Sequence, residues 1–250
     1  MNALSDADLY RRGIRTLLAS WEACARGSRG ATVVRERGVA AAVFPAGPER
    51  AFYNNAVLQR DLPGPDRAAA VDAMESAYAA AGITQFAAWA HEADAGLGRY
   101  LSERGYTITE STQAMALDLA ADLRLPRPPL DLAPSDWREY LRIIEVPPGM
   151  LDGADPADFH VLIARLDGES VAAGMSIDRD GDCGIFNVGT REHARRRGLA
   201  TALTACFVHD AAARGCRTAS LQATPMAERA YAAVGFRDLG RITEYSPPPS

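Results

Sequence analysis

The sequence contains no lysine, so all 27 of its basic residues are arginine. They stand against 32 acidic residues and leave a net charge of −5. A general nucleic-acid-binding protein usually carries a basic excess, so this balance argues against that class of partner. Cysteine is scarce too: Cys24, Cys183, Cys206 and Cys216 form no C-x-x-C pair and have no histidine at zinc-site spacing. We therefore expect a reduced, cytoplasmic protein without a metal site.

Long hydrophobic runs are also missing. No apolar stretch approaches the roughly 20 residues that span a bilayer, and the N-terminal segment 1–21 is charged and periodic, unlike a secretion signal. We expect no membrane partner. Hydrophobic residues make up 48% of the chain, which is enough for a packed core. The length suits one large domain or two of about 125 residues each.

The order of predicted elements occurs twice along the chain. After a helix that begins near Ser5, the first half predicts a hairpin (31–44), a strand (51–59), a helix (66–81), a strand (83–90), a helix (92–104) and one or two strands (107–119). The second half predicts a helix (136–145), a hairpin (161–177), a strand (183–190), a helix (198–213), a strand (218–223), a helix (225–234) and closing strands (236–245).

A short internal echo supports a duplication. The segment YLSERGY ends in Gly105 and Tyr106, and AYAAVGF ends in Gly235 and Phe236, at the same spacing in both halves. Between the halves, LRLPRPPLDLAPSD contains four prolines. We therefore predict two domains, 1–122 and 136–250, joined by a Pro-rich linker over 123–135.

The segment REHARRRGLATAL (191–203) carries the clearest chemical signal. A buried strand leads into a basic turn that ends at Gly198, and a helix with a core-facing apolar stripe begins there. A helix start leaves backbone N–H groups without partners and adds partial positive charge, while glycine lets an anion approach closely. The unit is suited to hold a pyrophosphate. The alternative is that Arg195–Arg197 are solvated charges at a helix start.

The motif RRRGLA (195–200) resembles the Arg/Gln-x-x-Gly-x-Gly/Ala signature of the GCN5-related N-acetyltransferases, the GNAT superfamily. The resemblance implies that backbone amides of this turn bind the pyrophosphate of acetyl-coenzyme A, the co-substrate. Arg195, Gly198 and Ala200 occupy the signature positions, although glycine is commoner at 200. The candidate coenzyme-binding residues are Val188, Arg195, Arg196, Arg197, Gly198, Leu199, Ala200, Thr201 and Thr224.

A second segment, ATPMAERAYAAVGF (223–236), resembles the later motif of the same family. Thr224 and Pro225 have the residue types of a helix cap and first turn, although asparagine is commoner at 224 in the family. The resemblance implies that Tyr231 protonates the departing thiolate; the alternative is a helical tyrosine packed on the sheet. The implied fold is α/β (α+β), with two tandem GNAT-like domains, each a mixed, mostly antiparallel sheet flanked by helices.

The chemistry that the resemblance implies is direct attack of a primary amine on the thioester. Val188 is the expected backbone donor to the oxyanion. Glu145 is the candidate base, with His160 and Asp182 as alternatives near strand ends. His91, His193 and His209 show no partner pattern that indicates a role.

The first half departs from this pattern. Its counterpart of the basic turn is DLPGPD (61–66), where Pro63 and Pro65 remove N–H donors and Asp61 and Asp66 add negative charge. Leu101 stands where the other half has Tyr231. We expect a degenerate domain that binds no coenzyme and contributes to the acceptor side, with the asparagines of FYNNAV (52–57) as polar groups there. An unrelated α/β domain is the alternative.

Three functional hypotheses remain at this stage. The first is an acetyl-coenzyme A-dependent N-acetyltransferase acting on a small-molecule or peptide amine, as a monomer or homodimer. The second is a non-catalytic module that binds or senses acyl-coenzyme A. The third, nucleic-acid binding through Arg195–Arg197, is disfavoured by the acidic chain and the lack of interleaved aromatic residues.

Overall fold

The computed structural model describes residues 4–46, 53–120, 123, 126–147 and 150–249. Residues 51–52 of the predicted strand 51–59, and residues 121–122 and 124–125 around the predicted domain boundary, lie outside this range. The chain divides into two compact units that interleave along the sequence. The α5 unit contains residues 1–20, 113–147 and 155–239, and the α2 unit contains residues 21–112, 148–154 and 240–250.

Helix α1 (Asp6–Arg26) begins where the sequence predicts. The hydroxyl of Ser5 accepts a hydrogen bond from the Asp8 amide at 3.2 Å, and acidic residues in the first turn suit the positive end of the helix dipole. The helix stops before Gly27, where an added Cβ would lie 2.1 Å from the Ala154 backbone nitrogen. Only glycine allows that close approach.

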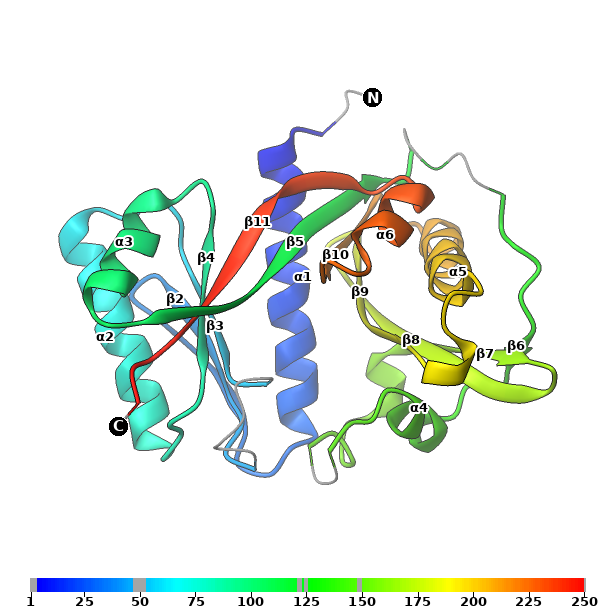
Figure 1. Cartoon of the computed structure of the whole chain (residues 1–250), viewed down its shortest axis with the longest axis horizontal. Helices are drawn as coiled ribbons and strands as arrows, with labels where there is room; N and C mark the ends of the chain where they lie inside the picture. The colour runs from blue at the N-terminus through cyan, green and yellow to red at the C-terminus, as the bar shows by residue number, and fades with distance from the viewer. Residues whose placement is uncertain (1–3, 47–52, 121–122, 124–125, 148–149, 250) are drawn as a thin grey trace. The chain divides into compact units, whose positions relative to one another are not determined.

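The α2 unit is a sheet with two helices on one face. Its elements are β1 (Thr32–Glu36), β2 (Val39–Val43), β3 (Asn55–Leu58), α2 (Gly64–Ala80), β4 (Ala87–His91) and α3 (Ala95–Glu103). The strand order is β1-β2-β3-β4-β11-β5, with β3 and β4 parallel and the β1–β2, β2–β3 and β4–β11 pairs antiparallel. Helices α2 and α3 lie on the same side of these strands, as Figure 1 shows. Their buried residues pack in one core with Ala88, Ala90 and Tyr245.

The α5 unit repeats this plan. Its elements are β6 (Leu132–Ala133), α4 (Trp137–Ile143), β7 (His160–Leu166), β8 (Glu169–Arg179), β9 (Asp182–Thr190), α5 (Leu199–Ala213), β10 (Thr218–Ala223) and α6 (Glu228–Val234), with short 3₁₀ turns at Pro156–Asp158 and Glu192–Ala194. The order β5-β10-β9-β8-β7-β6 has one parallel pair, β9–β10. Cys183 and Ile185 face α5, while Gly184 faces Thr16 of α1.

Each unit is completed by a strand from elsewhere in the chain. Strand β5 (Thr107–Asp118) follows α3 in sequence, yet its residues 113–118 pair with β10 in the α5 unit. Strand β11 (Arg237–Ser246) follows α6, yet its residues 242–245 pair with β4 in the α2 unit. The two halves of the sequence therefore exchange their last strands.

The sequence echo has a common structural basis. Gly105 and Gly235 end helices α3 and α6 with left-handed backbones, at φ of +86° and +112°. The next amide, of Tyr106 or Phe236, donates to the carbonyl five residues earlier, that of Leu101 at 3.0 Å or Tyr231 at 3.2 Å. This is the Schellman-type helix end that favours glycine. Leu101 and Tyr231 therefore hold equivalent positions.

The predicted mixed, mostly antiparallel sheets flanked by helices are confirmed. Residues 107–119, predicted as one or two strands, form one long strand over 107–118, and one local correction concerns α6. Helix α6 begins at Glu228, not at 225, and its cap residue is Ala227. The prediction that Thr224 caps the helix with its side chain is wrong, because residues 224–227 close a separate turn in which the Thr224 carbonyl accepts the Ala227 and Glu228 amides.

The described part of the Pro-rich segment packs on the α5 unit. Leu123, Leu130 and Leu132 contact the core under α5. Strand β6 pairs with β7, and Arg127 forms an ion pair with Asp210 of α5. The division of the sequence into domains 1–122 and 136–250 stays a prediction, because the compact units interleave. Among the described helices, none combines the length and apolar character that crossing a membrane requires.

Candidate functional site

Strands β9 and β10 of the α5 unit stop pairing partway along their length. Their last parallel partners are Gly184 and Ser220. Strand β9 then continues to Thr190 and β10 to Ala223 without further pairing between them. The edge of β9 that follows Gly184 therefore offers backbone groups that β10 does not use.

A bulge interrupts the other edge of β9. Its pairing with β8 runs through Gly189 opposite Ala173 and resumes at Phe186 opposite Met175. Asn187 and Val188 thus stand opposite Gly174 alone, the two-against-one arrangement of a β-bulge. Asn187 takes a left-handed backbone there, at φ +51°. A bulge re-aims the local peptide groups, and Val188 is the residue for which the family resemblance implied an oxyanion-binding amide.

The basic turn follows β9 directly. Gly198 has φ +77° and caps α5 without a side chain, and a Cβ added to Gly198 would meet no other atom within 4 Å. The six amides from Arg196 to Thr201 donate to no described residue, since the first recorded backbone bond of this helix runs from Ala202 to the Gly198 carbonyl at 2.9 Å. A glycine turn with free amides at a helix start is a site for a phosphate group.

The three arginines of this turn are exposed. The Nε of Arg195 donates to the Thr190 carbonyl at 3.2 Å, which ties the turn to the end of β9. Arg196, left-handed at φ +66°, and Arg197 have no ion-pair partner within the described chain. Positive side chains oppose the helix dipole, so this arrangement is more favourable with an anion bound. The turn therefore fits a pyrophosphate in both backbone geometry and charge.

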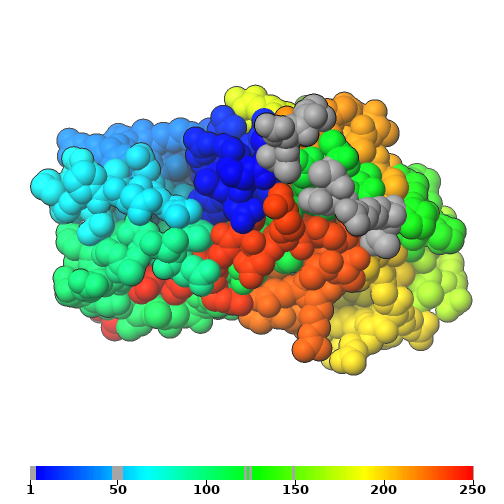
Figure 2. Space-filling view, turned by 90° about the horizontal axis from the view of Figure 1, so that it is seen from above, coloured from blue at the N-terminus to red at the C-terminus, as the bar shows by residue number. Residues whose placement is uncertain are grey.

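Tyr231 lies on α6 with its ring in the core. The side chain is 7% exposed, and its ring meets Phe236 edge-on at a centroid distance of 6.2 Å. Burial raises the pKa of the Tyr231 phenol to about 12. The hydroxyl is therefore protonated at neutral pH, which a general acid requires. Figure 2 shows the segment around α6, in orange, at the molecular surface.

Glu145 follows α4 and is exposed, with a left-handed backbone at φ +58°. Its neighbour Ile144 packs against β9: a Cβ on Gly189 would lie 3.2 Å from Ile144 Cγ2. Glu145 is thus one residue from a contact with the strand that carries Val188. This brings it near the end of β9, while its role as a base stays a prediction.

The two alternative bases are held by other partners. Asp182 is 1% exposed, and its carboxylate accepts hydrogen bonds from Thr16 at 2.7 Å, Thr218 at 2.6 Å and Ser220 at 2.7 Å. These hydroxyls tie α1 and β10 to the start of β9. Such a satisfied buried carboxylate has a structural role.

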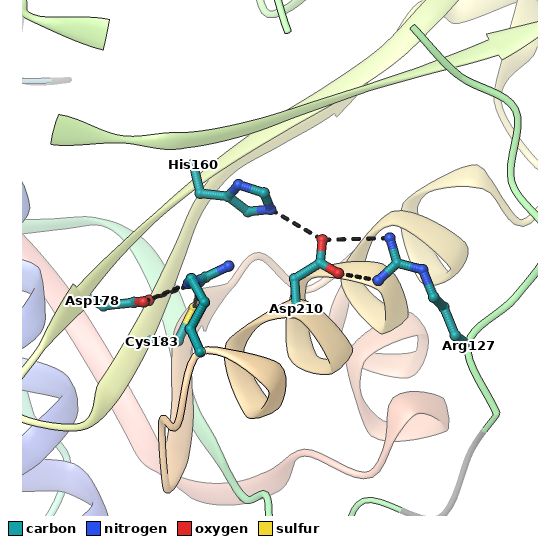
Figure 3. A network of polar contacts seen from close by, with 6 residues as sticks. Arg127, His160, Asp178, Cys183 and Asp210 are labelled. Atoms are coloured by element: carbon teal, nitrogen blue, oxygen red, sulfur yellow. Dashed lines mark hydrogen bonds and ion pairs between the residues drawn. The ribbon is translucent and has the colours of Figure 1, made fainter. Parts of the chain in front are cut away.

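His160 belongs to a network on α5, shown in Figure 3. Its Nε2 lies 3.1 Å from Asp210 Oδ2, and Asp210 also binds Arg127. Burial alone would raise the pKa of the Asp210 carboxyl, but its bonds to Arg127 and His160 lower it overall. Asp210 comes twelve residues after Gly198, which places it about 18 Å along the helix axis from the basic turn. Through Arg127, the network connects the Pro-rich segment to α5.

The counterpart turn of the α2 unit is organised differently. Strand β3 ends one residue after its last β4 partner, Val57, and its pairing with β2 shows no bulge. The Asp61 amide donates to the Asp94 carboxylate at 2.9 Å, and Arg67 lies 4.0 Å from that carboxylate. Asp94 also caps α3 through the Leu97 amide at 3.0 Å. A side chain of the protein itself therefore occupies part of this turn.

The sequence patterns did not predict the residues that shape the bulge. Asn187, Gly174 and Tyr140 shape the bulge, and the Asn187 side chain reaches the Tyr140 hydroxyl at 3.4 Å. One signal was present, because asparagine is depleted inside strands and marks special backbone geometry there. Its partners come from α4 and β8, which the local pattern does not connect. Within the described part of the chain, no group of three or more His, Cys, Asp or Glu side chains is arranged to hold a metal ion.

Comparison with known proteins finds a family profile that resembles part of the chain. The acetyltransferase (GNAT) family profile matches residues 119–236, whereas no curated protein sequence matches the chain. A GCN5-related N-acetyltransferase structure from Kribbella flavida is 21% identical, with a TM-score of 0.71 over 98% of this chain and 96% of its own. One from Sphaerobacter thermophilus is 18% identical, with a TM-score of 0.56 over 98% and 94%.

A third solved structure is a tandem GNAT protein from the clavulanic acid biosynthesis pathway. It is 13% identical, with a TM-score of 0.58 over 99% of this chain and 98% of its own. These three likenesses show that the fold extends over the whole chain. The profile match is thus limited to residues 119–236, whereas the likeness in fold to GNAT structures covers nearly all of the chain.

Proposed function

We propose that this protein is an N-acetyltransferase that moves an acetyl group from acetyl-coenzyme A to a primary amine of a small molecule or peptide. The observation that carries the proposal is the turn at Gly198, where six consecutive amides without a partner among the described residues adjoin three exposed arginines. In this proposal the amides of Arg196, Arg197, Gly198, Leu199, Ala200 and Thr201 bind the pyrophosphate. Arg195 holds the turn against Thr190, and Thr224 lies beside the coenzyme arm.

The remaining site residues divide the acid–base work. The free edge of β9 after Gly184 receives the arm that carries the thioester. The amide of Val188, in the bulge, stabilises the oxyanion formed when the amine attacks. Glu145 accepts the proton that the amine loses, and Tyr231, protonated at neutral pH, gives a proton to the departing thiolate. Much of the rate enhancement comes from holding the two reactants together.

The α2 unit is proposed to be a degenerate copy that binds no coenzyme. Its repeated element order, exchanged last strand and matching helix ends support a tandem duplication. Its counterpart turn has lost two N–H donors to Pro63 and Pro65, and Asp94 takes the Asp61 amide. We place the protein in a reducing compartment, the cytoplasm, because its cysteines follow no disulfide or zinc pattern.

The test is turnover by the purified 250-residue chain. Free coenzyme A released from acetyl-coenzyme A is measured with a thiol reagent over a panel of polyamines, amino acids, aminoglycosides and peptides with free N-termini. Amine-dependent thiol release with acetylated product confirmed by mass spectrometry supports the proposal. Coenzyme binding without turnover over the whole panel would favour the non-catalytic sensing module instead.

A further inference from the structure

Asn187, in the bulge of β9, has a backbone conformation that is unusual for a non-glycine residue within a strand. It is left-handed at φ +51° in the middle of β9. Asp167 and Asp180 of the same unit share this conformation, but they lie in the turns of the β7–β8 and β8–β9 hairpins, where it is ordinary. Positive φ is uncommon for residues other than glycine, and asparagine is enriched among the exceptions. Strain within a strand is often kept at a functional site.

The neighbours of Asn187 leave room for this conformation. Gly174 stands opposite the bulge, where an added Cβ would lie 2.9 Å from Phe207 Cε2 and 3.1 Å from Val188 Cγ2. Gly189 is the first residue of β9 after the bulge, and a Cβ added there would lie 3.2 Å from Ile144 Cγ2. The bulge is therefore enclosed by α5 through Phe207 and by the end of α4 through Ile144.

The side chain of Asn187 is anchored to the same helix α4. Its Nδ2 donates to the Tyr140 hydroxyl at 3.4 Å. Tyr140 is fully buried, and its ring stacks on Trp137 at 5.0 Å, which stacks on Phe159 at 5.2 Å. Rings packed in this way have little freedom, so the hydroxyl that receives the Asn187 amide is a fixed point.

The geometry points to Asn187 as a positioning residue that holds the Val188 N–H toward the acyl carbonyl of the thioester. The peptide group between Asn187 and Val188 turns with the backbone of Asn187, so a side chain that rejects positive φ rotates this N–H away. The bond to Tyr140 keeps the same peptide in register with α4. This inference rests on the proposed function and adds to it the residue that aligns the Val188 N–H, namely Asn187.

The experiment compares the affinities for free coenzyme A and acetyl-coenzyme A by titration calorimetry, together with kcat and KM. Val188 N–H contacts the carbonyl that only the thioester carries, so wild-type protein prefers acetyl-coenzyme A. Asn187→Val disfavours the left-handed backbone, so this variant should lose the preference for acetyl-coenzyme A. Its kcat should fall at least tenfold, while its affinity for free coenzyme A should change less than threefold. Asn187→Gly, which adopts positive φ freely, should retain the preference. Tyr140→Phe should reduce kcat about threefold.

The matched control is Asp180→Val, which introduces the same backbone conflict at the β8–β9 turn, at the opposite end of β9. It should lower the melting temperature without changing the preference. The inference fails if Asn187→Val is folded and keeps the wild-type preference and kcat, or if Asp180→Val loses both as well. If wild-type protein binds coenzyme A and acetyl-coenzyme A equally well, the kcat of Asn187→Val relative to wild type tests the inference. A wild-type protein that binds neither ligand contradicts the proposed function itself.

Discussion

Helices α5 and α2 hold equivalent places in the two units, since each follows the first strand of a parallel pair, yet they begin in contrasting ways. Before α5, a bulged strand runs beyond its last parallel partner, and six amides around a left-handed glycine have no partner in the described part of the chain. Before α2, a short regular strand leads into a proline-flanked turn, and the Asp94 carboxylate takes the Asp61 amide. Both starts keep a glycine. The comparison teaches that the availability of amides, not the glycine alone, distinguishes a proposed anion site from its silent counterpart.

The sharpest way to break this comparison is to block each helix start with the same change. Gly198→Asp places a carboxylate and a Cβ where the pyrophosphate is proposed to bind, and φ +77° also disfavours aspartate. At a hundredfold excess of acetyl-coenzyme A over Kd, wild type should gain about 2.7 kcal/mol, which is roughly 5–10 °C in melting temperature. Gly198→Asp should abolish that shift.

The matched variant is Gly64→Asp at the start of α2, where an added Cβ also meets no atom within 4 Å. It should leave the shift caused by acetyl-coenzyme A intact. Scanning calorimetry with and without ligand measures both variants. If Gly64→Asp removed the shift and Gly198→Asp did not, the two helix starts would have the opposite roles from those proposed.

The second comparison sets Tyr231 against its equivalent, Leu101. Tyr231→Phe keeps the ring in the core and removes only the hydroxyl, so kcat should fall about 10- to 100-fold while KM for acetyl-coenzyme A stays within about twofold. The wild-type pH–rate profile should show no loss from Tyr231 ionisation below about pH 11, because burial raises its pKa to about 12. Full activity of the variant across this range would remove the proposed acid.

The third test addresses the side chain that occupies the silent turn. Asp94→Ala removes the cap of α3 and the acceptor for the Asp61 amide, and it leaves Arg67 without its nearby carboxylate. We expect a loss of about 1–2 kcal/mol in the free energy of unfolding, measured by urea titration. Asp72 is an exposed residue of α2 that forms an ion pair with Arg104. Asp72→Ala serves as the control, and its free energy of unfolding should fall by less than about 1 kcal/mol. Equal losses would show that the hydrogen bonds of Asp94 contribute no more to stability than the exposed ion pair of Asp72.

The smallest effect concerns the exchanged strands. Glu244 of β11 is partly buried beside the charge of Glu110, and burial first, then this charge, raises its pKa to about 7. A raised pKa means that stability from the protonated form is complete below about pH 4.5 and is lost as the pH rises through 7. Glu244→Gln should therefore stabilise the protein by about 1 kcal/mol at pH 8, after allowance for solvent screening, and much less at pH 5.

Thermal unfolding at the two pH values measures this difference. Glu110→Gln, which removes the repelling charge while leaving Glu244 in place, should reproduce part of the gain at pH 8. The residue of β5 that corresponds to Glu244 is Ala114, since it precedes Glu244 by the same 130 positions that separate Gly105 from Gly235. The other exchanged strand therefore has a small, buried apolar residue at this position. A stability of Glu244→Gln that is equal to wild type at both pH values would contradict the raised pKa.

Local sequence signals predicted much of this protein. The hairpin at Arg37–Gly38, the strand that precedes the basic turn and the helix that begins beside Gly198 all appear as expected. These features depend on turn residues and apolar periodicity within a few positions, which a single sequence displays. The position of α6 was less predictable, because Thr224 and Pro225 serve equally well in the separate turn that precedes it.

The sequence by itself determined the unit of strand, arginine-rich turn, glycine and helix, because neighbouring residues encode each part of it. Only the tertiary structure decided which strands complete each sheet, where β9 leaves β10, how Asn187 reaches Tyr140 and which side chain occupies the turn before α2. Each of these depends on contacts between residues far apart in the chain. Their free energy comes from packing and hydrogen bonds that no local pattern records.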